Sequence, residues 1–321
     1  MAYDIIGDIH GQAEKLESLL RALGYHLRCG SWYHPERKAI FVGDFIDRGP
    51  EQLRTVGVVR QMVENESALA VMGNHELNAI AWHTPHPDGK GDYLRSRFHP
   101  QWGKKNRHQH QGFLEEVEHK PEIHADVINW FLTLPLWLDL PGIRVVHACW
   151  HQTYIDWLSP MLTERKQLPR ELLEAATSEP ADPATKDSAT PSVFKAVEAL
   201  LKGIEVPLPE PYSFTDKDGI LRKRVRVRWW DETAQHYPQA AMLSPTLRGQ
   251  LPDLPIPPHA LLPQVASKPV FFGHYWLTGQ PDVLTPHSAC VDYSAGKGGA
   301  LVAYRWNGEP TLSAANFVSA S

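Results

Sequence analysis

Three short blocks in this chain gather the kinds of side chain that bind divalent metal ions. They are Gly7–Gly11 (Gly-Asp-Ile-His-Gly), Gly43–Gly49 (Gly-Asp-Phe-Ile-Asp-Arg-Gly) and Gly73–Glu76 (Gly-Asn-His-Glu). Each block follows an apolar stretch that predicts a β-strand, so its Asp, His or Asn falls where that strand ends. Carboxylate oxygen, amide oxygen and imidazole nitrogen suit hard and borderline divalent metals. Because strand ends in α/β proteins lie together, the blocks predict a shared metal site.

The candidate residues of this predicted site differ in how their side chains can reach a metal ion. Asp8 and His10 are two residues apart on an extended segment, so both side chains leave the same face and can hold one metal. Asp44 ends the next strand and has two carboxylate oxygens with which to bridge to a second metal. Lone histidines follow two later apolar runs. A core histidine is the less favoured explanation for either one, and still less so beside the other blocks. The candidate metal ligands are Asp8, His10, Asp44, Asn74, His147 and His274.

The three blocks resemble those of the calcineurin-like metallophosphoesterases. Within that superfamily they are most similar to the phosphoprotein-phosphatase branch, whose second block reads Gly-Asp-x-x-Asp-Arg-Gly. The opening Met1–Gly11 and the later Leu23-Gly24-Tyr25 are also similar to bacterial diadenosine-tetraphosphate hydrolases of this branch. The resemblance covers residues 1 to about 80 and resumes around His147, His274 and the C-terminal strands.

This resemblance implies a centre of two divalent ions that activates a bridging hydroxide for attack on phosphorus. Manganese is the expected metal, with iron, zinc, nickel or cobalt as alternatives. The first ion would take the matches to Asp8, His10 and Asp44. The second ion would take Asp44 again, together with Asn74, His147 and His274.

The resemblance also assigns roles to residues that hold no metal. His75 would be the general acid that protonates the leaving oxygen, and Asp47 would hydrogen-bond it and favour its charged form. Arg48 would hold phosphate oxygens. A second phosphate-binding arginine is expected elsewhere in the chain. Arg228 is the candidate, and Arg226 lies on the same face of the alternating run that contains both.

Two departures from the family pattern bear on function. Many metallophosphoesterases end with Gly-His-x-His, whereas Trp276 stands here at the place of the second histidine. Symmetrical diadenosine-tetraphosphate hydrolases often lack the second Asp of the middle block, whereas this chain keeps Asp47. The retained Asp47 favours phosphomonoester chemistry with acid assistance to the leaving group.

Up to the third block, predicted strands alternate with predicted helices in a βαβ pattern, and these elements must position the candidate residues. Together with the resemblance, this pattern predicts an α/β sandwich of two mixed β-sheets flanked by helices (αββα) with insertions, in one domain over residues 1–321. The polar residues 83–121 predict an insertion near the active site. Residues 178–191 and the proline-rich 251–263 predict mobile loops, and 221–229 alternates like a strand.

Composition narrows the class of protein further. The chain has 321 residues, of which 42% are hydrophobic, enough for a substantial core. A net charge of −5 provides no basic field for nucleic acid or for an anionic membrane surface. The three cysteines lack metal-site spacing and indicate thiols in a reducing compartment. No apolar run reaches membrane-spanning length, so we expect a cytoplasmic protein without a membrane partner.

Four functions are compatible with these observations. The leading hypothesis is a di-metal phosphatase that hydrolyses phosphomonoesters on protein Ser or Thr, or on small molecules and nucleotides. A dinucleoside polyphosphate hydrolase is the nearest alternative, and a polynucleotide end phosphatase is disfavoured because a basic groove is missing. A non-catalytic scaffold is a further alternative from a different class. The presence of every expected ligand and of His75 argues against it.

Overall fold

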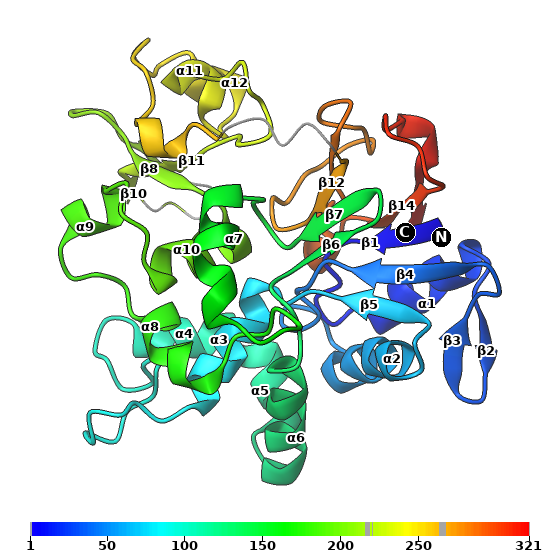
Figure 1. Cartoon of the computed structure of the whole chain (residues 1–321). Coiled ribbons are helices and arrows are strands. Elements are labelled where there is room, and N and C mark those ends of the chain that lie inside the picture. The colour runs from blue at the N-terminus through cyan, green and yellow to red at the C-terminus, as the bar shows by residue number, and fades with distance from the viewer. Residues whose placement is uncertain (1, 216–218, 220, 263–267, 321) are drawn as a thin grey trace.

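Two mixed β-sheets pack face to face in the computed structural model, which describes residues 2–215, 219, 221–262 and 268–320 (Figure 1). The first sheet has the order β15-β14-β1-β4-β5, and the second has the order β13-β12-β7-β6. Each sheet joins parallel and antiparallel pairs, so the predicted α/β sandwich of two mixed sheets is confirmed.

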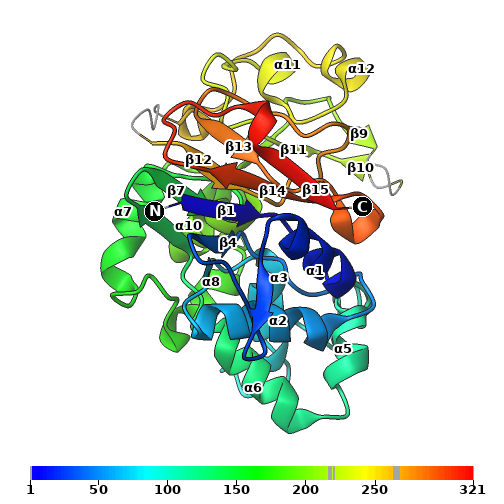
Figure 2. The same cartoon turned by 90° about the vertical axis from the view of Figure 1, so that its right-hand side faces the viewer.

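The first sheet carries the strands that precede the three sequence blocks. Its strands are β1 (Ala2–Ile6), β4 (Arg37–Phe41), β5 (Ala68–Ala70), β14 (Leu301–Trp306) and β15 (Phe317–Ala320). Figure 2 shows β1 between β4, its parallel neighbour, and β14, its antiparallel neighbour. Alternation along β1 sends Ile5 into the layer between the sheets and Ile6 toward the helices outside, and both are fully buried.

The second sheet carries the strands that precede the two later histidines. Its strands are β6 (Trp137–Leu140), β7 (Ile143–Val146), β12 (Val270–Phe272) and β13 (Ser288–Cys290). Phe271 faces the first sheet, with its ring centroid 5.0 Å from that of Tyr304 on β14. The next residue, Phe272, points outward to the ring of Trp230 at 5.3 Å. Both faces of this sheet are therefore buried.

Helices cover the outer faces of both sheets (Figure 1). Amphipathic α1 and α2 lie on the first sheet because their buried positions recur at helical spacing, as in Leu16, Leu19 and Leu20. The helices are α1 (Ala13–Ala22), α2 (Gln52–Glu64), α3 (Asn74–His83), α4 (Gly103–Gln109), α5 (Gln111–Val117), α6 (Pro121–Phe131), α7 (Gln152–Leu158), α8 (Leu173–Thr177), α9 (Pro183–Asp187), α10 (Val193–Lys202), α11 (Tyr237–Ala240) and α12 (Pro245–Arg248).

Short elements complete the described part of the chain. Three two-stranded sheets pair β2 (His26–Arg28) with β3 (Ser31–Tyr33), β8 (Glu205–Pro207) with β11 (Arg224–Arg226), and β9 (Phe214–Thr215) with β10 (Leu221–Arg222). Single 3₁₀ turns occupy η1 (Ser159–Met161), η2 (Arg170–Leu172), η3 (Pro258–Ala260), η4 (Ala295–Lys297) and η5 (Ala314–Asn316). Across the described residues, no helix combines the length and the apolar character that crossing a membrane requires.

The segments predicted as insertion and loops contain more helix than their composition suggested. Residues 83–121 include all of α4 and α5, and 178–191 include α9. The stretch 251–263 contains η3, and its last residue lies outside the described part. The predicted strand over 221–229 is a correction: it is two short strands, β10 and β11, and the pairing of β11 with β8 ends at Arg226.

Candidate active site

The candidate ligands lie where strands of both sheets end, and half of them have backbone angles that L-residues rarely adopt. Five non-glycine residues of the predicted site have positive φ, which crowds a Cβ atom against its own backbone. Strain of this kind persists only where the surrounding structure enforces it, and it gathers at functional sites. These residues are His10 (51°), Asp44 (52°), Asp47 (70°), Arg48 (71°) and His274 (72°).

Glycine lets these strand ends approach one another closely. A Cβ on Gly73 would lie 2.3 Å from both the backbone nitrogen and Oδ1 of Asp44, and one on Gly273 would lie 1.9 Å from Oδ1 of Asp8. Neither glycine has positive φ, so what these positions require is space. The glycines that precede Asn74 and His274 therefore bring the third block and the last histidine onto the first two blocks.

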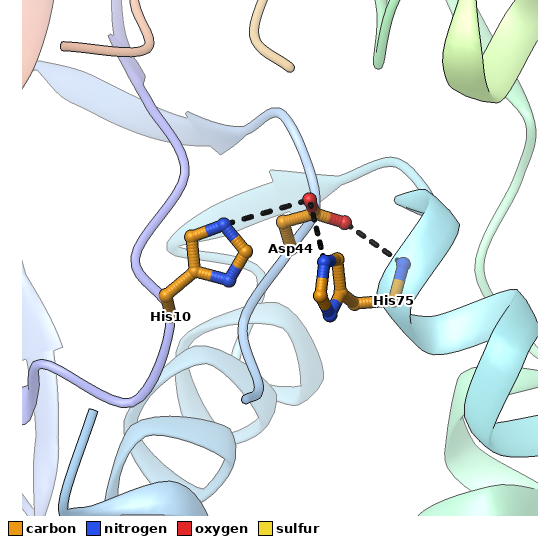
Figure 3. Close-up of side chains that lie close together, drawn as sticks. All are labelled: His10, Asp44 and His75. Atoms are coloured by element: carbon orange, nitrogen blue, oxygen red, sulfur yellow. Dashed lines mark hydrogen bonds and ion pairs between the residues drawn. The ribbon is translucent and has the colours of Figure 1, made fainter. Parts of the chain in front are cut away.

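Asp44 lies at the centre of the site and faces a histidine on each side. Its Oδ2 lies 3.7 Å from Nε2 of His10 and 3.9 Å from Nε2 of His75 (Figure 3). Its Oδ1 lies 3.4 Å from Nε2 of His147 and accepts a 3.0 Å hydrogen bond from the backbone N–H of His75. The two carboxylate oxygens thus face two separate groups of nitrogen donors, as the bridging role predicted for Asp44 requires.

The second group of donors surrounds the amide oxygen of Asn74. This oxygen lies 3.0 Å from Nε2 of His147 and 2.8 Å from Nδ1 of His274. Asp44, His147 and His274 are close enough to hold one ion, and all three are buried. The structure therefore brings together the four side chains predicted for the second metal.

The first group differs in one member from the predicted set. The donor atoms close enough to share an ion belong to His10, Asp44 and His75, whereas the sequence had placed Asp8 in this set and His75 outside it. Asp8 lies against the same centre: its Oδ2 accepts a 2.9 Å hydrogen bond from the backbone N–H of His274, and its Oδ1 is buried without a partner.

Several buried atoms of this centre fit a metal because they have lone pairs and no hydrogen-bond partner. His10 donates its Nδ1–H to the carbonyl of Ile46 at 2.9 Å, which leaves the lone pair on Nε2. That Nε2, Nε2 of His274 and Oδ1 of Asp8 are all unpartnered. Burial lowers the pKa of His10 to about 3, with His75 adding to the effect, so its imidazole is neutral. The donor set suits a borderline divalent ion.

The charges of the buried carboxylates also favour a bound metal ion. Burial is the main cause that raises the pKa of Asp8 well above its usual value, and the carboxylates of Asp292 and Asp44 add repulsion. Burial would also raise the pKa of Asp44, but the imidazoles of His147 and His75 outweigh it and hold that pKa well below its usual value. A dication would relieve the repulsion between these carboxylates.

His75 and Asp47 form the pair expected of a general acid and the group that orients it. Nδ1 of His75 donates to Oδ2 of Asp47 at 2.6 Å, so Nε2 faces the centre. Burial alone would lower the pKa of His75, but the carboxylates of Asp44 and Asp47 raise it above its ordinary value. Because Asp47 already engages Nδ1, Nε2 is the nitrogen through which His75 can act at the centre, either as an acid or as a ligand.

Sequence reasoning missed a third member of this pair. His110, which joins α4 to α5 inside the 83–121 segment, donates its Nδ1–H to Asp47 at 2.9 Å from Oδ1 and 3.1 Å from Oδ2. It is buried, with 1% of its surface exposed. The sequence marks 83–121 only as rich in histidine and offers no signal that singles out His110.

A cavity of about 250 Å³ opens over Asp44, Asn74 and His75. Four cationic side chains line it: Arg48, Arg95, Lys202 and Arg226. The guanidinium of Arg48 lies 4.5 Å from the ring centroid of Trp276, the residue that stands where many family members have histidine. The cavity therefore combines a polar floor with cations that suit an anionic ligand.

Arg228 does not line this cavity. Its Nη2 pairs with Asp231 at 3.2 Å, and its backbone N–H donates to the carbonyl of Ala240. Burial still alternates from Val225 to Trp229, but the pairing with β8 ends at Arg226 and Val227 instead bridges to Ala241, so Arg228 lies beside a different segment. Arg226, the other arginine considered from the sequence, lines the cavity.

Two buried carboxylates support the strand ends. Glu76 accepts hydrogen bonds from the backbone N–H groups of Asp44, Phe45 and Gly73 at 2.8, 2.8 and 2.9 Å. Asp292 accepts from the backbone N–H groups of Trp276 and Ser294 at 2.7 and 2.9 Å. Both therefore fix backbone rather than contribute donors to the centre.

Comparison with protein families shows to which family this chain belongs. The calcineurin-like phosphoesterase family model matches residues 1–184, which is more than half of the chain. This chain belongs to the calcineurin-like phosphoesterase family. The family implies divalent metal ions and hydrolysis of phosphoester bonds, in agreement with the two groups of donors around Asp44.

Relatives within the family match the first blocks only. The asymmetrical bis(5'-nucleosyl)-tetraphosphatase PrpE of Geobacillus sp. is 53% identical over 76 residues, and that of Oceanobacillus iheyensis is 45% identical over 76 residues. The matched segment is 23% of this chain and 31% and 30% of those proteins, respectively. The chain thus spans less than a third of the length of these relatives.

Two solved phosphatase structures align with this chain at low sequence identity. A serine/threonine phosphatase from Saccharomyces cerevisiae aligns with a TM-score of 0.49 and 14% identity, over 100% of this chain and 80% of that one. A cold-active protein-tyrosine phosphatase from Shewanella sp. aligns with a TM-score of 0.49 and 13% identity, again over 100% and 80%.

Proposed function

We propose that this protein hydrolyses phosphomonoesters, on protein Ser or Thr or on small molecules and nucleotides, with two divalent ions, of which manganese is the expected metal. The observation that carries the proposal is the position of Asp44, with one carboxylate oxygen facing His10 and the other facing His147. Such a carboxylate between two sets of imidazole donors is what a two-metal site requires. The three unpaired cysteines suit a cytoplasmic location.

The ligands divide into two sets that share Asp44. We assign Asp8, His10 and Asp44 to one ion, and Asp44, Asn74, His147 and His274 to the other. When bound, two such ions polarise a phosphoryl group and lower the pKa of water so that it attacks phosphorus in line with the leaving oxygen. Arg48 and Arg226 hold the non-bridging oxygens of the phosphate from the walls of the cavity.

His75 moves the proton in this proposal. Its Nε2 faces the cavity while Asp47 holds Nδ1. Although burial would lower the pKa of His75, the carboxylates of Asp44 and Asp47 raise it above its ordinary value, which favours the protonated ring. As the bond between phosphorus and the leaving oxygen breaks, Nε2–H donates its proton to that oxygen. The departing alcohol therefore leaves neutral, which matters most when its own pKa is high.

The proposal is tested by metal content and by activity together. Purified protein loaded with manganese should hydrolyse p-nitrophenyl phosphate, and elemental analysis should find two ions per chain. Asp44→Asn removes one negative charge from between the two ions, so both should bind weakly and activity should be lost. Two tightly held metals in Asp44→Asn would contradict the bridging assignment. The matched control is Asp139→Asn, on β6 and away from the cavity.

A second candidate function is hydrolysis of dinucleoside polyphosphates, the activity named for the PrpE relatives. One structural observation favours it. A second cavity of about 190 Å³, lined by Tyr154, Phe194 and eleven other residues, shares Lys202 and Arg226 with the catalytic cavity. A substrate with several phosphates and an aromatic base could extend from one cavity into the other.

A substrate panel with manganese separates the two candidates. Phosphopeptides, mononucleotides, diadenosine tetraphosphate and 5'-phosphorylated oligonucleotides should be compared by kcat/KM. Preference for mononucleotides or phosphopeptides supports the phosphomonoester proposal. A preference of about 100-fold or more for diadenosine tetraphosphate, which corresponds to roughly 2.7 kcal/mol of transition-state binding, would favour the second candidate instead.

A further inference from the structure

We infer that His110 is a positioning residue for the general acid, and that the 83–121 segment therefore helps to set the catalytic machinery. This inference rests on the proposed function, because it concerns the pair formed by Asp47 and His75. Asp47 lies between two imidazoles, with Oδ2 accepting from Nδ1 of His75 at 2.6 Å and Oδ1 accepting from Nδ1 of His110 at 2.9 Å.

A hydrogen bond to His75 alone does not fix the orientation of the Asp47 carboxylate. A carboxylate bound only to His75 can rotate about its terminal torsion, and the imidazole can follow it. Nδ1 of His110 lies 2.9 Å from Oδ1 and 3.1 Å from Oδ2, so it holds the carboxylate from a second direction and restricts that torsion. The backbone N–H of Asp47 is held separately by Oε1 of Gln52 at 2.6 Å. Backbone and side chain of Asp47 are thus each anchored.

The second step is that His110 is itself held against the helix that carries His75. Its neighbour Gln109 accepts a 2.8 Å hydrogen bond from Nη2 of Arg95, and Nη1 of Arg95 donates to Oδ1 of Asn78. Asn78 lies three residues after His75, on the same helix, α3. The chain of contacts therefore closes on itself, from α3 through the inserted segment and Asp47 back to α3.

The third step concerns why a histidine occupies this position. Its ring packs on Phe113 with centroids 5.1 Å apart and lies 6.2 Å from the ring centroid of Trp82, so the side chain also fills space. A packing role and a positioning role therefore have to be separated by experiment. They differ in what they need: packing needs the ring, whereas positioning needs a donor at the place of Nδ1.

Two substitutions make this separation. His110→Phe keeps a ring of similar volume and removes the donor, whereas His110→Asn removes the ring and keeps an N–H at about the place of Nδ1. We expect His110→Phe to lower kcat for an alkyl phosphate by about 10- to 100-fold, with a much smaller loss for p-nitrophenyl phosphate, whose leaving group needs little protonation. His110→Asn should recover most of kcat for the alkyl phosphate. KM should change little in both variants.

A control variant and two contrary results complete the test of His110. His108→Phe, on the exposed side of α4, should behave as wild type. Tolerance of His110→Phe together with damage by His110→Asn would show packing alone and overturn the inference, as would equal losses on both substrates. If His110→Phe does not fold, His110→Ala replaces it in the comparison with His110→Asn, and equal kcat in those two variants would count against the inference.

His75→Asn separates failure of this inference from failure of the proposed function. If His75→Asn shows no dependence on the leaving group, the proposed acid is wrong whatever His110 does. If His75→Asn shows that dependence and His110→Phe behaves as wild type, only the role of His110 fails. Metal content of the His110 variants, measured by elemental analysis, should stay at the wild-type value, because His110 belongs to neither group of donor atoms that are close enough to hold an ion.

Discussion

Glu76 holds the backbone of Asp44, the residue that faces both groups of metal donors. Its Oε2 accepts hydrogen bonds from the N–H groups of Asp44 and Gly73, and its Oε1 accepts from Phe45. Asp44 has a φ of 52°, so its conformation is costly and needs such support. Burial, reinforced by the charge of Asp44, raises the pKa of Glu76 to about 7. A carboxylate placed here thus stabilises the strained turn at an electrostatic cost.

Replacement of Glu76 should affect both stability and metal binding. Glu76→Gln leaves one amide oxygen for the three backbone donors and points an NH₂ group at the remainder. We expect a loss of about 1–3 kcal/mol in the free energy of unfolding. Metal affinity should fall with it, because Asp44 is no longer held. Denaturant unfolding of the metal-free protein and metal titration measure the two effects. Glu64→Gln, an exposed residue paired with Arg60, is the control that should change neither.

His75→Asn tests acid catalysis directly. Removal of the acid should lower kcat for an alkyl phosphate by about 10²- to 10⁴-fold and that for p-nitrophenyl phosphate far less. The measurement is a plot of log kcat against the pKa of the leaving alcohol, which should be steeper for the variant than for wild type. Parallel lines for the two enzymes would mean that another group supplies the proton.

The two candidate phosphate arginines form a matched pair. Arg226 lines the catalytic cavity, whereas Arg228, two residues later, pairs with Asp231 outside it. Arg226→Ala should therefore lower kcat/KM by about 10- to 100-fold, the value of a charge-assisted hydrogen bond, and Arg48→Ala should do the same. Arg228→Ala should stay within a few-fold of wild type. An Arg228→Ala variant as damaged as Arg226→Ala would restore the role that the sequence suggested for Arg228.

His151 should make stability depend on pH below neutrality. It caps α7 by accepting the backbone N–H of Tyr154 through Nδ1, and burial lowers its pKa to about 4. The unfolded chain has a histidine pKa of about 6.5, so between pH 6.5 and 4 the unfolded state binds the extra proton. Stability from this group is therefore fully present above pH 6.5 and falls as the pH drops toward 4.

His151→Asn isolates this effect, because asparagine is a good helix cap and does not titrate. The fall in unfolding free energy between pH 7 and pH 5, measured by denaturant titration, should be smaller for the variant than for wild type. The same fall in both proteins would show that other groups cause the acid sensitivity. His26→Asn, the same substitution at an exposed position on β2, serves as the control.

The metal-ligand candidates could be predicted because each is a side chain at the end of a strand. Asp8, Asp44 and Asn74 follow strands of one sheet, and His147 and His274 follow strands of the other. The local pattern marks these strand ends, whereas the arrangement in two sheets is implied by the family resemblance. His110 could not be predicted in this way. It reaches Asp47 from a segment with no strand pattern, and its role depends on how that segment folds back over α3.

Arg226 and Arg228 show how far alternation along a strand can predict which side chains enter the site. Alternation along 221–229 places Arg226 and Arg228 on one face only while the strand continues, and the pairing of β11 ends at Arg226. Whether a strand continues depends on the partner that pairs with it, here β8, and not on its own residues. A prediction that depends on the last two residues of a strand is therefore weaker than one that depends on its presence.

The position of β1 has a consequence for how the protein is made. Both neighbours of β1 follow it in the chain, and one of them, β14, begins only at Leu301. A nascent chain interrupted before residue 301 would leave β1 without that neighbour, and one interrupted before His274 would also lack a candidate ligand. We therefore expect truncated products to be inactive and open to proteases, so that incomplete synthesis in the cell does not release a partly active hydrolase.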